Sequence, residues 1–328
     1  MPYHPRSRSV LAALPLALVL ASCGGGADGD TGTGTGATSG GAGAEPLSVV
    51  ASFYPLQYLT QQVAGEHAEV DVLTSPGVDP HEVELSPRQI AELGSADLVV
   101  VLAGLQPAVD EAVAQQSPQH TLDIADAADL LALGESTVEH DEHVDAGADD
   151  GHDHGAEDPH FWLDPLRYAD AADAVAARLA EVDPENADAY LANAEALVAE
   201  LTTLDGEFQR GLATCETRDV VTTHEAFGYL GHRYDLNVIG ITGISPESEP
   251  SPARLAEVTA QVRDLGVGTI FTEPLLPPGI AETVAQETGA SVLTLDPVEG
   301  INDASAGADY LGVMRANLAA LRDGLVCS

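Results

Sequence analysis

The sequence contains no lysine: all twelve of its basic residues are arginine, and they face 53 acidic residues. Without lysine the chain has neither a Walker-type phosphate loop nor a Schiff-base nucleophile. The formal net charge of −41 argues against nucleic acid as a partner, because nucleic-acid binding depends on Lys and Arg side chains. Such a charge is typical of a soluble protein or of life in salt, and attraction of cations is a further possible consequence.

The sequence also has no apolar run long enough to cross a membrane. The longest one near the N-terminus, Val10 to Ala21, has twelve residues, whereas a membrane-spanning helix needs about 20. Arg6 and Arg8 precede this run and small residues follow it. This order predicts a signal peptide over residues 1–22.

The four residues Leu20-Ala21-Ser22-Cys23 resemble the lipobox of bacterial lipoproteins. The resemblance implies that Cys23 is lipidated and becomes the first residue of a mature chain anchored to the outer face of the cytoplasmic membrane. Residues 23–45, nearly all Gly, Thr and Ala after the cysteine, would then be a flexible tether.

Only two further cysteines exist, Cys215 and Cys327. An extracytoplasmic location permits a disulfide between them. Two unpaired buried thiols are the alternative, and the sequence leaves both open.

Short apolar runs alternate with helical stretches on both sides of the middle of the chain. This alternation predicts two α/β lobes, residues 46–182 and 214–328, each with a parallel sheet covered by helices. The expected strands are Leu47–Phe53, Val70–Leu73, Asp97–Ala103 and Thr121–Ile124 in the first lobe, and Asp219–Thr223, Asn237–Ile241, Gly268–Phe271 and Ser291–Leu295 in the second.

A long helical block lies between the lobes. One helix is expected over Arg167–Glu181 and a second from Asp183 to about Ala213, with Asp183 and Pro184 as N-cap and first residue. The second helix, within a linker of residues 183–213, would be about 45 Å long and would join the lobes rigidly. Two ordinary helices within one lobe are the alternative.

Residues 135–158 are acidic and almost without large apolar side chains, so they predict a surface loop. Short His-rich tracts bind metal weakly, and the loop is either a collector of Zn²⁺ or a simple solvated segment. Its histidines are His140, His143, His152 and His154.

Three other histidines and one aspartate lie where chemistry is expected. His81 follows a predicted strand, His224 ends the run VVTTH, and Asp296 follows the last strand in SVLTLDP. Ligands of open α/β sheets bind at the carboxyl ends of strands. These three residues therefore indicate one cleft between the lobes, and His160, in DPHFWLDP, lies on the connection into the long helical block.

Three neutral imidazoles and a carboxylate form a tetrahedral site that suits Zn²⁺. A site closed by four protein ligands favours holding and releasing a metal over catalysis. If water took the fourth position instead of Asp296, the same histidines would resemble a hydrolytic centre with Glu225 as general base. The HExxH motif of zinc proteases is absent.

Several segments together resemble the zinc-uptake solute-binding lipoproteins of ABC importers, a group related to manganese receptors. The resemblance extends from about Leu47 to the C-terminus. It rests on the segments GVDPHEVELSP, PHFWLDP, THEAFGYL, GISPESEPSP, FTEP and the LDP near residue 296.

The resemblance implies two α/β lobes joined by a long rigid helix, with metal bound in the cleft between them. It also implies His81, His160, His224 and Asp296 as ligands, although in zinc relatives the fourth ligand varies among aspartate, glutamate and water. Glu249 and Glu273, in the matching segments, would orient the ligands through hydrogen bonds. Manganese relatives typically have a carboxylate where this chain has His224, and nitrogen ligands suit zinc better.

The function implied is capture of Zn²⁺ and delivery to an ABC permease, without catalysis, by a monomer. A manganese or iron receptor on the same scaffold, a surface zinc hydrolase and an adhesive lipoprotein that carries zinc incidentally are the alternatives.

Overall fold

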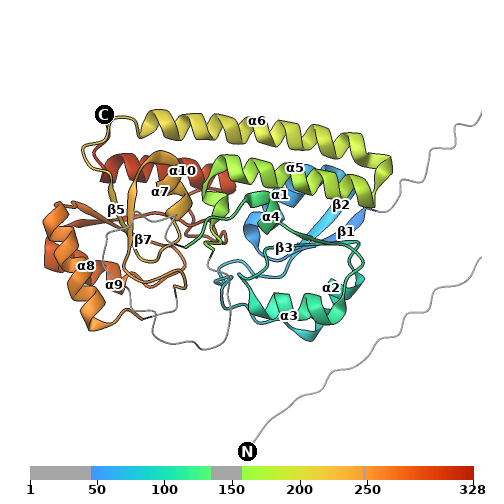
Figure 1. Cartoon of the computed structure of the whole chain (residues 1–328), viewed down its shortest axis with the longest axis horizontal. Helices are drawn as coiled ribbons and strands as arrows, with labels where there is room; N and C mark the ends of the chain where they lie inside the picture. The colour runs from blue at the N-terminus through green and yellow to red at the C-terminus, as the bar shows by residue number, and fades with distance from the viewer. Residues whose placement is uncertain (1–45, 134–156, 247–248) are drawn as a thin grey trace, which may run out of the picture. The chain divides into compact units, whose positions relative to one another are not determined.

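The computed structural model describes residues 46–133, 157–246 and 249–328. It contains two four-stranded sheets, and every strand pair in both is parallel (Figure 1). The first sheet has the order β2-β1-β3-β4 and the second the order β6-β5-β7-β8, so the two share one topology. The strands are β1 (Leu47–Ala51), β2 (Ala68–Val72), β3 (Leu98–Val101), β4 (Thr121–Asp123), β5 (Asp219–Thr222), β6 (Asn237–Gly240), β7 (Thr269–Thr272) and β8 (Ser291–Thr294).

Helices cover both faces of each sheet, as the predicted α/β class requires. In β3 (LVVV), Leu98 and Val100 pack toward one face, while Val99 and Val101 pack toward the other. Strands buried on both faces, such as β3, read as continuous apolar runs, whereas β2, β4 and β8 have exposed polar positions. The covering helices are α1 (Tyr54–Ala64), α2 (Pro87–Ser95), α3 (Pro107–Gln116) and α4 (Ala125–Ala128) in the first lobe, and α7 (Gly228–Tyr234), α8 (Pro252–Leu265), α9 (Gly279–Thr288) and α10 (Tyr310–Gly324) in the second.

Three helices begin with the same signal, a capping side chain followed by proline. Ser86 caps α2, Asp164 caps α5 (Pro165–Val182) and Ser251 caps α8, each by accepting a hydrogen bond from a backbone N–H in the first turn. Proline fits the next position because its missing N–H would have no intrahelical partner there.

The long linking helix is α6 (Ala187–Gly211), 25 residues and about 37 Å at 1.5 Å per residue. The predicted start at Asp183 is four residues too early, because Asp183 is followed by a short 3₁₀ turn, Pro184–Asn186, and the α-helix begins after it. Helix α6 packs on α1 and α5 of the first lobe and on α10 of the second (Figure 1). Asn193 donates to Val63 on α1, and near the other end Arg315 of α10 pairs with Glu207.

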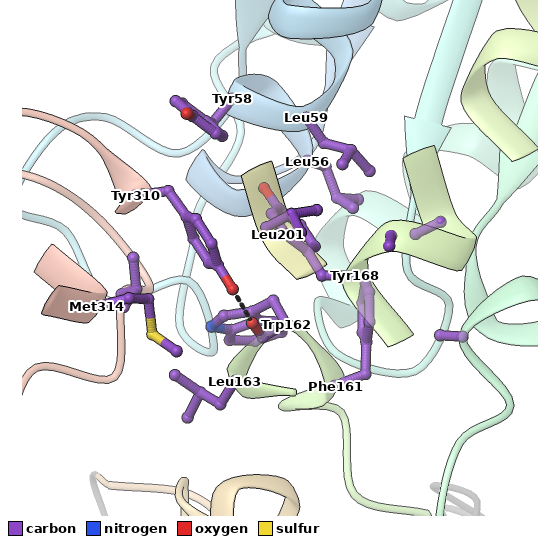
Figure 2. Packing of buried hydrophobic residues seen from close by; sticks show 14 of the residues in the cluster. Leu56, Tyr58, Leu59, Phe161, Trp162, Leu163, Tyr168, Leu201, Tyr310 and Met314 are labelled. Carbon is purple, nitrogen blue, oxygen red and sulfur yellow. Dashed lines mark hydrogen bonds between the residues drawn. The ribbon is translucent and has the colours of Figure 1, made fainter. Parts of the chain in front are cut away.

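One hydrophobic cluster runs through both lobes. At its middle, Tyr310 of α10 packs on Tyr168 of α5 with ring centroids 4.4 Å apart, and its hydroxyl donates to the carbonyl oxygen of Trp162 at 2.6 Å (Figure 2). These side chains are fully buried. A shared core of this kind fixes the position of one lobe against the other.

Within the part of the chain that the structure describes, no helix is long and apolar enough to cross a membrane. The predicted signal peptide, Cys23 and the predicted tether lie outside the described residues, as do the four histidines of the predicted acidic loop.

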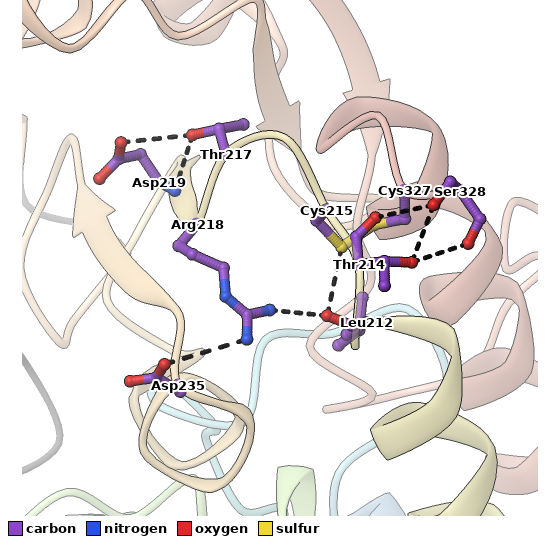
Figure 3. The surroundings of a disulfide bond; sticks show 9 residues. All are labelled: Leu212, Thr214, Cys215, Thr217, Arg218, Asp219, Asp235, Cys327 and Ser328. Carbon is purple, nitrogen blue, oxygen red and sulfur yellow. Dashed lines mark hydrogen bonds and ion pairs between the residues drawn. A yellow bond between two sulfur atoms is a disulfide. The ribbon is translucent and has the colours of Figure 1, made fainter.

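Cys215 and Cys327 form a disulfide, which decides between the two alternatives that the sequence left open (Figure 3). Next to it, the C-terminal Ser328 and Thr214 are joined by hydrogen bonds. The bond therefore attaches the end of the chain to the segment that follows α6.

Replacing Cys215 and Cys327 with serine is expected to lower the free energy of unfolding by about 2 to 5 kcal/mol. The physical reason is the sequence separation of 112 residues, because an open loop of that length gains much entropy on unfolding. Urea denaturation with and without reductant measures the effect, and the double serine variant should not respond to reductant. An unchanged midpoint for the reduced parent would contradict the expectation.

Candidate metal centre

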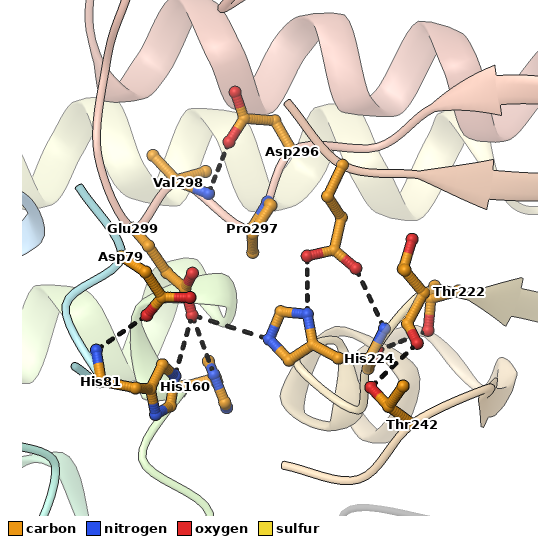
Figure 4. A network of polar contacts seen from close by, with 12 residues as sticks. Asp79, His81, His160, Thr222, His224, Thr242, Asp296, Pro297, Val298 and Glu299 are labelled. Atoms are coloured by element: carbon orange, nitrogen blue, oxygen red, sulfur yellow. Dashed lines mark hydrogen bonds and ion pairs between the residues drawn. The ribbon is translucent and has the colours of Figure 1, made fainter. Parts of the chain in front are cut away.

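Four side chains from separate parts of the chain meet at one point. His81 lies in the turn after β2, His160 immediately before the 3₁₀ turn Phe161–Leu163, and His224 two residues after β5. Glu299 lies in the segment after β8. Both lobes contribute, so the centre forms only when they are held together (Figure 4).

The four donor atoms lie close enough together to bind one ion. The Oε1 atom of Glu299 lies 3.2 Å from Nε2 of His81, 3.2 Å from Nε2 of His160 and 3.6 Å from Nε2 of His224. All four donor atoms lie within 4.8 Å of one another. Ligands bonded to a tetrahedral ion at about 2.1 Å are roughly 3.4 Å apart, so the three distances from Glu299 Oε1 are compatible with an ion of zinc's size.

The outer nitrogens of two of the histidines lie against carboxylates. His160 Nδ1 lies 2.8 Å from Asp158 Oδ1, and His224 Nδ1 lies 2.6 Å from Glu273 Oε2. A carboxylate at Nδ1 holds the proton there and leaves Nε2 of the neutral ring as the metal donor. The rings are therefore oriented for coordination before an ion arrives.

The tripeptide Asp-Pro-His occurs twice and forms the same turn each time. Asp79 Oδ1 accepts the backbone N–H of His81 at 2.8 Å, and Asp158 Oδ1 accepts that of His160 at 3.0 Å. An aspartate that accepts the N–H two residues on fixes a tight turn. The repeated turn places both imidazoles at the ends of short, rigid loops.

Burial makes the electrostatics of the centre strong. His160 and His224 are fully buried, and Glu299 is 2% exposed. Burial alone would raise the pKa of Glu299, but its contacts with the three imidazoles bring that pKa well below its usual range. Burial alone would lower the pKa of His224, but Glu273 and Glu299 together raise it to about 10. The pKa of His160 is also raised, because Asp158 and Glu299 outweigh the effect of burial.

A cavity of about 160 Å³ opens beside His81. Its lining includes Gly104, Leu130 and Pro159 from the first lobe and Ile244 from the second. The centre thus lies at a cleft between the lobes, and an ion can reach it along the His81 side.

Comparison with known proteins decides the family. The model of the family described as zinc-uptake complex component A, periplasmic (ZnuA), matches residues 49–324. The chain belongs to the ZnuA family.

Two relatives and one solved structure illustrate the similarity. The chain is 34% identical over 279 residues to the zinc-binding lipoprotein AdcA of Streptococcus pneumoniae, covering 84% of this chain and 55% of AdcA. It is 32% identical over 294 residues to the high-affinity zinc uptake system protein ZnuA of Bacillus subtilis, covering 88% of this chain and 91% of that protein. The crystal structure of the Zn(II)-bound ZnuA-like domain of S. pneumoniae AdcA matches with a TM-score of 0.69 and 31% identity, over 85% of this chain and 99% of that domain.

The chain thus spans about half the length of the AdcA relative. The likeness confirms the resemblance that the sequence motifs indicated and the architecture of two α/β lobes.

The structure does not bring together all of the predicted ligands of this ZnuA-family chain. His81, His160 and His224 lie together, but the carboxylate beside them belongs to Glu299 and not to Asp296. The carboxylate of Asp296 folds back onto its own turn, where Oδ1 accepts the N–H of Val298 at 2.8 Å (Figure 4). Asp-Pro favours turn initiation, so the aspartate closes the turn and the next carboxylate along the chain, Glu299, points into the centre. That turn signal was present in the sequence.

The two glutamates predicted to orient ligands have different positions. Glu273 is 4% exposed and contacts both the ring and the backbone N–H of His224. Glu249 is exposed on the segment before α8, and the prediction for it is not supported. Asp158, which the sequence analysis overlooked, contacts His160 as Glu273 contacts His224.

Binding of a metal ion at this centre should release protons. The raised pKa of His224, about 10, keeps its ring charged at neutral pH in the metal-free protein, whereas a ligand imidazole must be neutral. We expect release of at least one proton per ion and a fall in affinity of about tenfold for each pH unit from 8 to 6. Calorimetry in buffers of different ionisation enthalpy measures both.

A variant of the exposed His232, His232→Gln, should release the same number of protons as the parent. Affinity that is constant from pH 7.5 to 5 would contradict a three-histidine centre.

Proposed function

We propose that this protein captures Zn²⁺ outside the cytoplasmic membrane and delivers it to an ABC permease. The observation that carries the proposal is the closed set of three imidazoles and one carboxylate at the cleft between the lobes. Its four protein donors complete a tetrahedral coordination sphere, which leaves no position for a substrate. Such a site holds and releases an ion, and Zn²⁺ here is cargo rather than a cofactor.

The chemistry of the donors favours zinc over manganese. Manganese is a harder ion that prefers oxygen ligands, while imidazole suits zinc. The family description and the names of the AdcA and ZnuA relatives agree with zinc.

A hydrolase is less well supported by the geometry. Glu225, which the sequence suggested as general base, packs against Gly240 of β6. The contact is so close that a Cβ atom added to Gly240 would lie 2.3 Å from Cγ of Glu225. We therefore propose binding and delivery without catalysis.

The remaining parts of the proposal concern location and partners. Lipidation at Cys23 would hold the protein on the outer face of the membrane, close to a permease, and one relative is named a lipoprotein. The acidic loop, with His140, His143, His152 and His154, would collect Zn²⁺ weakly. A monomer suffices, because all four proposed ligands come from one chain.

Metal content measured by mass spectrometry after mild chelation tests the capture step. The parent should retain one zinc per chain, and His81→Ala, His160→Ala and His224→Ala should each lose it. Loss of a direct ligand is expected to weaken binding by more than the 10- to 100-fold typical of outer partners. His232→Ala, on the exposed face of α7, serves as the control and should keep its zinc.

A parent that holds manganese, or that exchanges its zinc for Mn²⁺ in direct competition, would establish the rival receptor. Zinc retained in all three ligand variants would refute the centre itself.

A further inference from the structure

Four consecutive residues after β8, Asp296 to Glu299, form an arm that places the Glu299 carboxylate at the three imidazoles (Figure 4). Three of its four residues, Asp296, Pro297 and Val298, form backbone hydrogen bonds with side chains. Two of these side chains come from other parts of the structure and one belongs to the arm itself. All four residues of the arm are buried. The arm is therefore part of the packed interior of the protein and not a surface loop.

Asn317 of α10 forms two hydrogen bonds with the backbone of Asp296, the first residue of the arm. The backbone N–H of Asp296 donates to Asn317 Oδ1 at 2.9 Å, and Asn317 Nδ2 donates to the carbonyl oxygen of Asp296 at 2.7 Å. Asn317 is itself 2% exposed. A buried amide whose oxygen and nitrogen both bond to one backbone residue fixes that residue in position and orientation.

Two more hydrogen bonds fix the next residues. Trp162 Nε1 donates to the carbonyl oxygen of Pro297 at 2.8 Å, and the N–H of Val298 donates to Asp296 Oδ1, also at 2.8 Å. Trp162 is two residues from His160, and the two rings lie 5.3 Å apart. One short segment thus provides both His160, a proposed ligand, and Trp162, which forms a hydrogen bond with the arm that bears Glu299.

Val298 has a backbone that valine seldom adopts. Its φ is +60°, in the left-handed region, which is a genuine outlier for a β-branched residue. Strained residues persist where their surroundings hold them, and they concentrate at ligand sites. A return of Val298 to negative φ would turn the following residue, Glu299, in another direction.

The geometry points to Asp296 as a positioning residue of the zinc centre: its carboxylate, with Asn317 and Trp162, holds Val298 in the left-handed conformation that aims Glu299 at the three histidines. The inference rests on the proposed function and assigns a task to the residue that sequence reasoning took for a ligand. Asp296 acts through the position of Glu299 and does not touch the ion.

A double-mutant cycle on zinc affinity tests the inference. Zinc dissociation constants are measured by competition with a chelator for the parent, Asp296→Ala, Glu299→Ala and the double variant. Asp296→Ala is expected to weaken binding by about 10- to 100-fold, the usual effect of losing an outer partner of a metal ligand. In the Glu299→Ala background the same substitution should have almost no effect, because the group that it positions is gone.

Asp296→Asn separates positioning from coordination. An asparagine oxygen still accepts the N–H of Val298, so this variant should bind zinc within about threefold of the parent. If Asp296 were a ligand, replacing its charged oxygen with a neutral amide oxygen would weaken binding by about tenfold or more. That result would overturn the inference.

Two further outcomes would also overturn it. Equal losses from Asp296→Ala in both backgrounds would indicate general damage, and no loss in either would show that the hydrogen bond does not position Glu299. Should Asp296→Ala fail to fold, Trp162→Phe, which removes the bond to Pro297, is carried through the same cycle with the same expectations.

Asn193→Ala is the matched structural control. It removes a hydrogen bond between an amide side chain and the backbone, to Val63, far along α6 from the arm, and zinc affinity should not change. A parent that binds no zinc would refute the proposed function, whereas a parent that binds zinc with Asp296→Ala unchanged would refute only the positioning role.

Discussion

The arrangement of the centre depends on one contact: a buried carboxylate oxygen of Glu299 lies against the imidazoles of three histidines. A buried charge is tolerated only where it is paired and hydrogen-bonded, and Glu299 finds its partners on both lobes. In the metal-free protein, the raised pKa values of His160 and His224 favour protonated imidazoles, which supply the positive charge. A divalent cation bound there would replace those protons. Proton and metal therefore compete for one prepared site.

The rest of the fold keeps the two halves of this centre in register. Helix α6 packs on both lobes, and Tyr310 joins α10 to the segment of Trp162 through a hydrogen bond. On the cleft side, Tyr229 of α7 accepts from the N–H of Leu131 and donates to the carbonyl oxygen of Asp158. Asp158 in turn orients His160. Tyr229 therefore links the second lobe, through Asp158, to one of the histidines of the centre.

Much of this architecture could be read from the sequence, for physical reasons that differ by element. Strands buried on both faces have apolar runs such as LVVV, and helices that begin at Ser-Pro or Asp-Pro carry their own start signal. The histidines stood out because each follows a strand or a turn motif. Glu299 did not stand out in the same way. Its direction depends on the left-handed backbone of Val298, and valine is a residue type that rarely adopts that conformation. The pairing of Cys215 with Cys327 likewise depends on distance in space, which spacing along the chain does not give.

The central claim is tested most directly by a crystal structure of the zinc-loaded protein, with anomalous scattering recorded on both sides of the zinc absorption edge. We expect one strong zinc peak, with Nε2 of His81, His160 and His224 and one oxygen of Glu299 at about 2.0 to 2.2 Å. A peak ligated by Asp296 in place of Glu299, or one that lacks any of the three imidazoles, would contradict it.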